Sequence, residues 1–266
     1  MATQSKYLSK LADKRVLILG GTSGIGYAVA EGALEHGAHV TISGSNAAKL
    51  DKTVTRLREA YPSQTAKQSI TTHVCDLSDT ANLDANLKAL FEKATAGGTT
   101  KLNHIVTTAG DALQIQPLSE MTPEGIYAAG TVRIVAPMMV AKYIPQYVEQ
   151  SPASSFTLTN GARGHKPAPG WAVISAWATA GEGLVRGLGL DLKPVRVNIV
   201  SPGAVETELF SHFGSEAEQI REHFRKNSTT GTIGRPEDLA ESYLYLMKTE
   251  FATGSVVDVN GGTYLV

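Results

Sequence analysis

The regular alternation of short apolar segments with longer helical segments constrains the fold of this chain most strongly. The short segments are rich in β-branched residues, whereas the longer ones carry apolar residues at helical spacing. Such alternation favours parallel strands joined by right-handed crossover helices, with helices on both faces of the sheet. We therefore predict one doubly wound α/β domain spanning residues 1–266. The predicted strands are residues 15–19, 39–42, 70–75, 104–107, 155–159, 195–199 and 255–259, and the predicted helices are residues 25–36, 47–61, 81–94, 123–150 and 171–191.

Charge and cysteine content limit the classes of function. The formal net charge of −1 leaves no basic field for a nucleic-acid backbone, and the basic cluster at 221–226 is interpreted as a solvated helix face. The single cysteine, Cys75, provides neither a disulfide framework nor a thiol-rich metal site. No segment has the apolar length of a membrane span or a signal peptide, so we expect a cytosolic protein without a membrane partner. No metal is expected, because no acidic ligand spacing accompanies His36, His39, His73, His104, His165, His212 or His223.

A glycine-rich turn joins the first predicted strand to the first predicted helix, where ligands of such sheets bind. The turn reads Gly-Gly-Thr-Ser-Gly-Ile-Gly over residues 20–26. Gly20 permits a tight turn, Gly24 permits close approach of a pyrophosphate, and Gly26 permits close packing of helix and strand. Freed backbone N–H groups at a helix N-terminus favour an anion. We therefore predict a Rossmann dinucleotide site with contacts from Gly20, Thr22, Ser23, Gly24 and Ile25.

The end of the second predicted strand indicates which dinucleotide binds. An acidic residue there would hold both ribose hydroxyls of NAD and repel a 2′-phosphate, but residues 43–46 read Ser-Gly-Ser-Asn. Small donors without a carboxylate favour NADP(H), with Ser43, Ser45 and Asn46 as its contacts. Asp76, after the third strand, is interpreted either as a partner of the adenine amino group or as a helix cap.

Several motifs resemble those of the short-chain dehydrogenase/reductase family. They are the spacing of the glycine turn, Thr-Ala-Gly at 108–110, Val-Asn-Ile-Val-Ser-Pro-Gly at 197–203, Gly-Arg-Pro-Glu-Asp-Leu at 234–239 and Val-Asp-Val-Asn-Gly-Gly at 257–262. The resemblance implies a nicotinamide cofactor, a small-molecule substrate and a homodimer or homotetramer formed through the helices at 123–150 and 171–191. It also implies cofactor contacts from Ala109, Gly110, Pro202, Gly203, Val205 and Thr207.

The reactive groups of that family are missing from this chain. The family uses an asparagine, a serine, a tyrosine and a lysine, the last two spaced Tyr-x-x-x-Lys on one helix. Matching the motifs puts Ile174 at the tyrosine position and Ala178 at the lysine position. The serine position falls on Asn160 or Gly161, and the asparagine position falls on Arg133.

The missing tetrad favours a substrate that needs no proton donor. Hydride addition to a ketone builds negative charge on oxygen, and loss of a positioned general acid typically costs about 10²–10⁴ in rate. An iminium ion is already cationic and becomes a neutral amine, and a nearby lysine ammonium would repel it. We therefore predict reduction of a C=N⁺ bond in an apolar pocket.

Three residues are predicted to form the substrate site. Asp111 follows the fourth strand, where its carboxylate would stabilise an iminium or take a proton, unless it only closes a turn. Arg133 would bind an amide oxygen or orient Asp111, and the alternative is a salt bridge that rebuilds the helix. Trp171 would stack on an aromatic or cationic substrate, or pack in the core.

Three further residues are interpreted more simply. Trp177 is expected to pack in the core. Glu206 and Glu208 occupy the segment that closes over substrate in the family, or they begin a helix.

One divergent branch of the family shares Asp111, the Arg133 replacement and Pro-Gly-Trp at 169–171. It consists of fungal indole-alkaloid enzymes that reduce a cationic azadiene with NADPH and guide an intramolecular Diels–Alder closure. That branch carries an acidic residue just before the tryptophan, whereas residues 165–170 here read His-Lys-Pro-Ala-Pro-Gly. A non-redox cyclase or isomerase and a nucleotide-binding pseudoenzyme therefore stay open as alternatives to the reductase.

Overall fold

The strands form one parallel sheet in the order β3-β2-β1-β4-β5-β6-β7. The computed structural model describes residues 6–111, 113, 115–208, 210, 214 and 216–266. Each predicted strand overlaps an observed one, which confirms the doubly wound α/β class. The strands are β1 (Arg15–Leu19), β2 (His39–Gly44), β3 (Ile70–Val74), β4 (His104–Thr107), β5 (Ser155–Thr159), β6 (Arg196–Pro202) and β7 (Val256–Val259).

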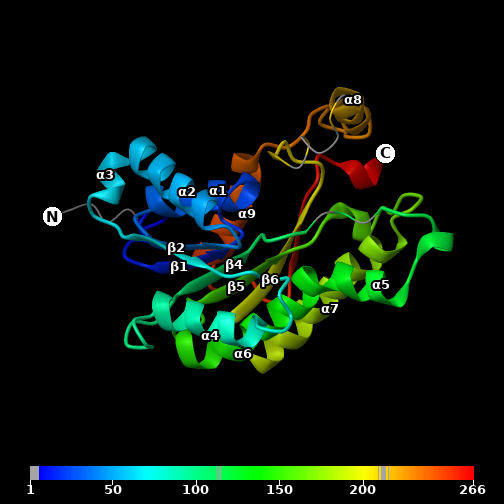
Figure 1. Ribbon diagram of the computed structural model, residues 1–266. Coiled ribbons are helices and arrows are strands. Elements are labelled where there is room, and N and C mark those ends of the chain that lie inside the picture. Colours follow the sequence, from blue (N-terminus) through cyan, green and yellow to red (C-terminus); the bar gives the residue numbers. More distant parts are fainter. Residues whose placement is uncertain (1–5, 112, 114, 209, 211–213, 215) are drawn as a thin grey trace.

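Helices cover both faces of this sheet, as Figure 1 shows. Their bounds are α1 (Gly24–Glu35), α2 (Ala47–Ala60), α3 (Pro62–Thr65), α4 (Leu83–Ala94), α5 (Pro123–Gly130), α6 (Ala136–Tyr147), α7 (Ala172–Asp191), α8 (Ala217–Lys226) and α9 (Pro236–Lys248). Helices α1, α2 and α9 lie on one face, and α4, α6 and α7 lie on the other (Figure 1). None of the helices in the described part of the chain is long and apolar enough to cross a membrane.

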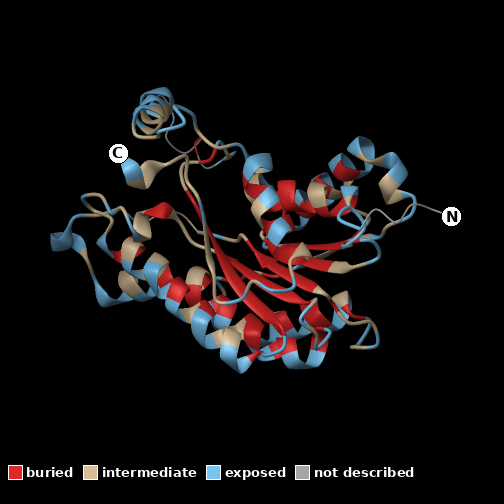
Figure 2. Ribbon diagram, turned by 180° about the vertical axis from the view of Figure 1, so that it is seen from behind, coloured by how far each residue is buried: buried red, intermediate tan, exposed pale blue. Residues whose placement is uncertain are grey.

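Strand β1 shows why the core has two halves. Successive side chains of a strand point to opposite faces. Leu17 and Leu19 therefore join the cluster with α4, α6 and α7, whereas Val16 and Ile18 join the cluster with α1 and α9. All four are at most 1% exposed, so each contributes about 1.5–3 kcal/mol by burial. Figure 2 shows this buried sheet between its helical layers.

The predicted helix at 123–150 is instead two helices separated by a π-helical turn at Thr131–Val135. Helix α5 ends at Gly130, where a methyl group would lie 2.7 Å from Trp177 Cε2. A π turn inserts one extra residue and so shifts the face on which the following side chains lie. The turn contains Arg133, whose guanidinium reaches the loop after β4. Interruptions of this kind are frequent at functional sites.

The carboxyl ends of the strands lead into the loops that hold most of the predicted site residues. Helix α8 lies beyond this edge, close to the C-terminal segment (Figure 1), and it has no buried residue. Figure 2 shows α8 with intermediate and exposed residues, separate from the buried sheet.

Candidate active site

The N-terminus of α1 has the geometry of an anion site. Ser23 is its N-cap residue and makes no side-chain capping bond. The first intrahelical bond runs from Tyr27 N to Ser23 O at 3.2 Å, so the earlier N–H groups have no acceptor within the helix. Gly20 and Gly24 adopt φ angles of +91° and +49°, which favour glycine. This uncapped turn fits the pyrophosphate of a dinucleotide.

The loop after β4 packs directly against the glycine turn. A methyl group on Gly20 would lie 2.4 Å from Ala109 N, so only glycine fits there. Ala109 N donates to Leu19 O, and Thr108 Oγ1 donates to Gly20 O at 3.2 Å. The turn after β1 and the loop after β4 therefore form one continuous rim, which includes Ala109 and Gly110.

The end of β2 carries no carboxylate between Ser43 and Asn46. Ser43 is 1% exposed, and its hydroxyl has no hydrogen-bond partner within the described residues. Asn46 caps α2 by accepting from Lys49 N at 2.9 Å, which leaves its amide nitrogen as a donor. Donor groups with no acidic residue beside them fit the 2′-phosphorylated ribose of NADP better than the ribose of NAD, which has two free hydroxyl groups.

Asp76 caps no helix. Its Oδ1 accepts from Ser78 N at 2.9 Å and from Ser78 Oγ at 2.6 Å, and these bonds hold the pKa of Asp76 below its ordinary value. Helix α4 starts later, with Asn82 as its N-cap. The expected contact with adenine stays a prediction.

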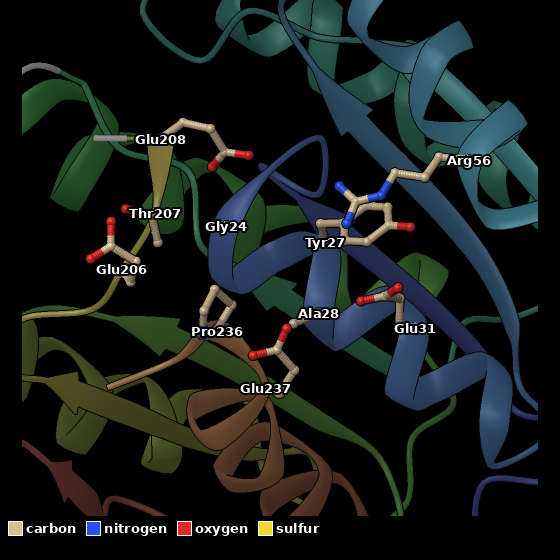
Figure 3. A pocket seen from close by; sticks show the side chains of 10 residues that line it. All are labelled: Gly24, Tyr27, Ala28, Glu31, Arg56, Glu206, Thr207, Glu208, Pro236 and Glu237. Atoms are coloured by element: carbon tan, nitrogen blue, oxygen red, sulfur yellow. The ribbon is translucent and has the colours of Figure 1, made fainter. Parts of the chain in front are cut away.

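A cavity of about 270 Å³ flanks the glycine turn between α1, α2, α9 and the segment after β6 (Figure 3). Figure 3 shows Thr207 and Glu208 beside Gly24, and Arg56 lying over the ring of Tyr27. A methyl group on Gly24 would lie 2.9 Å from Thr207 Cγ2 and 3.6 Å from Glu208 Oε2. A carboxylate thus lies near the anion-favouring end of α1, where a pyrophosphate would compete with it.

Asp111 and Arg133 lie in direct contact. Arg133 Nε is 3.1 Å from Asp111 Oδ1, which makes an ion pair without hydrogen-bond geometry. Arg133 Nη2 also donates to Asp111 O at 2.7 Å, and the guanidinium lies against Gly110. Each side chain is less than one-third exposed. The pair is therefore neutral overall, and the charge of Arg133 is opposed.

Trp171 stands apart from that pair. It is the N-cap residue of α7, and within the described residues no ring contact or hydrogen bond of its side chain reaches Asp111 or Arg133. The two loops nevertheless adjoin, because Gln116 N donates to Gly170 O at 3.3 Å. Ile115 also packs on Gly170, and a methyl group on that glycine would lie 3.2 Å from Ile115 Cγ2.

The tyrosine and lysine positions of the tetrad are apolar in space as well as in sequence. Ile174 is 9% exposed, and Ala178 packs against Gly164. Asn160, at the end of β5, donates through Nδ2 to Ala178 O at 3.2 Å. Its amide oxygen is buried without a hydrogen-bond partner among the described residues, as is the hydroxyl of Ser175. No titratable group thus replaces the family's tyrosine and lysine at these positions.

Glu182, the single charge between residues 170 and 184, is structural. It is 5% exposed, with Oε1 2.5 Å from His165 Nε2 and Oε2 3.6 Å from Arg186 Nη2. A buried carboxylate needs such partners. His165 therefore anchors its loop to α7. Another histidine of the sequence, His212, lies outside the described residues.

The structure also places Trp177 and Glu206, which the sequence analysis interpreted more simply. Trp177 is half-buried and belongs to neither core cluster, so the expectation of core packing is wrong; it packs on α5 and donates through Nε1 to Ile126 O at 2.9 Å. Glu206 forms an ion pair with Arg221 at 2.7 Å, which ties the segment after β6 to α8.

The contacts that Arg163 and Phe224 form near Trp171 were not predicted from the sequence. The guanidinium of Arg163, just after β5, lies 5.1 Å from the Trp171 ring and 5.9 Å from the Phe224 ring. The segment at 221–226 is thus not wholly a solvated face. The available sequence signals were a single aromatic residue inside a charged helix, which is Phe224, and an arginine after a strand, which is Arg163.

Comparison with known proteins places these features in context. The chain matches the family model described as "SDR-like rossmann domain" over residues 7–266. It is 45% identical over 266 residues to "Short-chain dehydrogenase/reductase malC" of Malbranchea aurantiaca, covering 100% of both chains. It is 40% identical over 268 residues to "Short-chain dehydrogenase/reductase fsr5" of Gibberella fujikuroi, again covering 100% of both.

Solved structures match over nearly the full chain. The "MalC Reductase/Diels-Alderase" of Malbranchea aurantiaca gives a TM-score of 0.92 at 45% identity, covering 98% of this chain and 100% of that one. A short-chain oxidoreductase of Pseudomonas aeruginosa, described as containing an atypical catalytic center, gives a TM-score of 0.82 at 24% identity. It covers 94% of this chain and 96% of that one, and it shows the fold alone.

Proposed function

Because this chain belongs to the short-chain dehydrogenase/reductase family of oxidoreductases, we propose that it reduces an imine or iminium C=N⁺ bond with NADPH. The substrate class is that of indole-alkaloid specialised metabolism, and the site around Asp111, Arg133 and Trp171 also guides an intramolecular Diels–Alder closure. One observation carries the proposal. The tyrosine and lysine positions hold Ile174 and Ala178, and the asparagine position holds an arginine whose charge is opposed by Asp111.

The electrostatics of the Asp111–Arg133 pair support a cationic electrophile. An unpaired guanidinium would repel an iminium strongly in a low-dielectric cleft. The ion pair at 3.1 Å removes most of that repulsion, and the second carboxylate oxygen stays able to face a positive charge. Asp111 is therefore assigned the role of stabilising the cation, and Arg133 the role of orienting Asp111.

The surroundings of Trp171 support an apolar, aromatic substrate. Its ring stands at the start of α7, one loop away from Ile115. An indole face attracts planar cations and aromatic rings. Trp171 is assigned the stacking role, which also limits the orientation of the bound substrate.

The cofactor is proposed to be NADP(H), which supplies the hydride when bound. The uncapped turn at Ser23, Gly24 and Ile25 would hold the pyrophosphate, together with Thr22 and Thr207. Ser45 and Asn46 would donate to the 2′-phosphate, where no carboxylate opposes it, whereas burial keeps the hydroxyl of Ser43 away from such a ligand. Ala109, Gly110, Pro202, Gly203 and Val205 would line the nicotinamide side.

A cyclisation function is supported by one further observation. A relative that is 45% identical over its whole length is named a reductase/Diels-Alderase. A cycloaddition needs mainly a cavity that restricts the substrate to a reactive fold, and apolar residues such as Ile115 and Ile174 can supply it.

The test begins with NADPH fluorescence on titration with the protein, followed by loss of NADPH absorbance on addition of a cyclic imine. Binding of NADPH and its consumption with the imine are the expected results. Binding of neither dinucleotide would refute the reductase, and tight binding without turnover of any C=N substrate would favour a pseudoenzyme. Product analysis with a diene-bearing imine then tests the cyclisation.

A further inference from the structure

Arg163 carries a positive charge and has no acidic partner among the described residues. It lies in the 3₁₀ turn Ala162–Gly164, directly after β5. Its one hydrogen bond within the described residues runs from Nη1 to Lys166 O at 3.2 Å. No carboxylate of the described chain lies within ion-pair distance, and burial alone holds the pKa of Arg163 below its ordinary value.

Two aromatic rings take the place of a counterion. The guanidinium carbon lies 5.1 Å from the centroid of Trp171, which begins α7, and 5.9 Å from that of Phe224, on α8. Both distances are within the range at which a ring face attracts a cation. The two rings come from segments far apart in the chain and meet at this one charge.

Phe224 is held in position by further contacts of α8. Its ring meets the Phe210 ring edge to face at 6.2 Å, and the Arg221 guanidinium lies 5.3 Å from Phe210. Arg221 in turn pairs with Glu206. The Phe224 ring is therefore also held by its neighbours, and the Arg163 guanidinium lies over both this ring and the Trp171 ring.

A guanidinium resembles an iminium ion in the properties that matter here. Both are planar, delocalised cations, and the guanidinium is weakly hydrated, so it can sit against aromatic faces with little loss of hydration. An ammonium group or a neutral ring lacks one or more of these properties. Rings arranged to hold the first cation are therefore suited to hold the second.

We propose that Trp171 and Phe224 form a binding seat for a planar organic cation, and that Arg163 occupies this seat until such a ligand displaces it. The identity of that ligand as a C=N⁺ substrate rests on the proposed function. The seat itself rests on the geometry of the three side chains.

Because a ligand must displace Arg163 from the two rings, the site prefers positively charged ligands. A neutral ring that entered the seat would leave Phe224 and Trp171 without a cation and would force Arg163 out without replacing its contacts. A cationic ring replaces those contacts. Arg163 is thus a specificity-determining residue: it lowers affinity for cationic rings, which must displace it, whereas a neutral ring gains too little from Trp171 and Phe224 to displace it and is little affected.

The experiment uses two probes of one ring shape, measured by isothermal titration calorimetry on the full chain at a pH where quinoline is neutral. N-methylquinolinium is the planar cation, and quinoline is its uncharged counterpart. Arg163→Gln removes the internal cation and is expected to bind N-methylquinolinium about tenfold more tightly than the wild type. Arg163→Lys keeps a positive charge and is expected to gain less than about threefold. Quinoline affinity should change less than about twofold in Arg163→Gln.

Trp171→Leu, added to Arg163→Gln, is expected to abolish the gain because it removes one ring face. Arg163→Met is the second neutral variant, and circular dichroism checks that each variant is folded. Equal or weaker binding of N-methylquinolinium by both neutral variants would overturn the proposal. So would absence of binding to any form, or an equal gain for quinoline.

A wild-type crystal soaked with N-methylquinolinium gives an independent readout. The ring should lie between Trp171 and Phe224, with Arg163 turned away, and a ring bound elsewhere in the cleft would contradict the seat. These measurements need neither NADPH nor turnover. Failure of the seat and failure of the reductase are therefore distinguishable.

Discussion

Arg133 and Asp111 form one unit at the carboxyl edge of the sheet, since Nε lies 3.1 Å from Oδ1 and Nη2 donates to the Asp111 carbonyl oxygen at 2.7 Å. The arginine comes from the π turn between α5 and α6, whereas the aspartate follows β4. Arg133, at the family's asparagine position, thus holds Asp111 in place. The net charge at this edge of the sheet therefore depends on both residues.

Asp111→Asn should lower turnover of a cyclic iminium at least about tenfold, because the carboxylate no longer offsets Arg133 or faces the cation. Steady-state kinetics with NADPH give the measurement, and the thermal midpoint shows whether the variant is folded. Asp51→Asn, at an exposed position on α2, is the matched control and should leave turnover unchanged. Unchanged turnover in folded Asp111→Asn would remove Asp111 from the site.

Ser45→Asp should change the dinucleotide preference. The position is exposed at the end of β2, and a carboxylate there would repel a 2′-phosphate. We expect the Kd for NADPH to rise about tenfold relative to that for NADH, as measured by nucleotide fluorescence. Ser45→Asn keeps a polar side chain without charge and serves as the control. An unchanged ratio of the two Kd values would place the 2′-phosphate elsewhere.

Glu208→Gln should bind NADPH about threefold more tightly at low salt, because its carboxylate lies near Gly24 at the N-terminus of α1. Glu237→Gln is the control, since Glu237 lines the same cavity from α9. The gain should shrink as salt is raised. Equal effects of the two substitutions would mean that Glu208 does not compete with the pyrophosphate.

His104 should make the fold sensitive to acid. It is 1% exposed on β4, its Nδ1 lies 2.9 Å from Ser155 Oγ, and burial lowers its pKa from 6.5 to about 3, with Arg196 and Lys14 adding to the shift. The unfolded chain gains this proton near its ordinary pKa, whereas the folded chain stays neutral. The stability contribution is therefore complete above pH 6.5 and is lost as the pH falls toward 3.

The measurement is urea unfolding at several pH values. His104 should account for a fall in the free energy of unfolding of about 1.4 kcal/mol per pH unit within that window. His104→Asn should show a correspondingly shallower slope, whereas His223→Asn, on exposed α8, should match the wild type. Identical slopes in all three proteins would show that His104 is protonated in the folded state.

Most of the fold followed from sequence because local patterns and tertiary structure agree. Most strands of the sheet are short runs rich in apolar and β-branched residues, and Gly20 and Gly24 in the glycine turn adopt the positive φ angles that glycine favours. Element ends were less predictable. The π turn at 131–135 follows Gly130, on which Trp177 packs, and that is a contact between segments far apart in the chain.

The site was predictable only in part, for the same reason. Motif spacing located Asp111 and Arg133, and their opposite charges suggested that they pair. The contact between Arg163 and Phe224 joins the end of β5 to α8, and no local pattern reports it. A charged helix with one aromatic residue looks solvated until the neighbouring segment is known.

The central claim is that a substrate with its own positive charge needs no proton-donating side chain. The most direct test compares the rate of NADPH consumption with an N-methylated cyclic iminium and with a ketone of the same ring size, over roughly pH 6 to 9. The account predicts that the iminium is reduced at a rate independent of pH and at least about 100-fold faster than the ketone. Equal rates for the two substrates, or an iminium rate that falls with loss of a titrating proton, would contradict it.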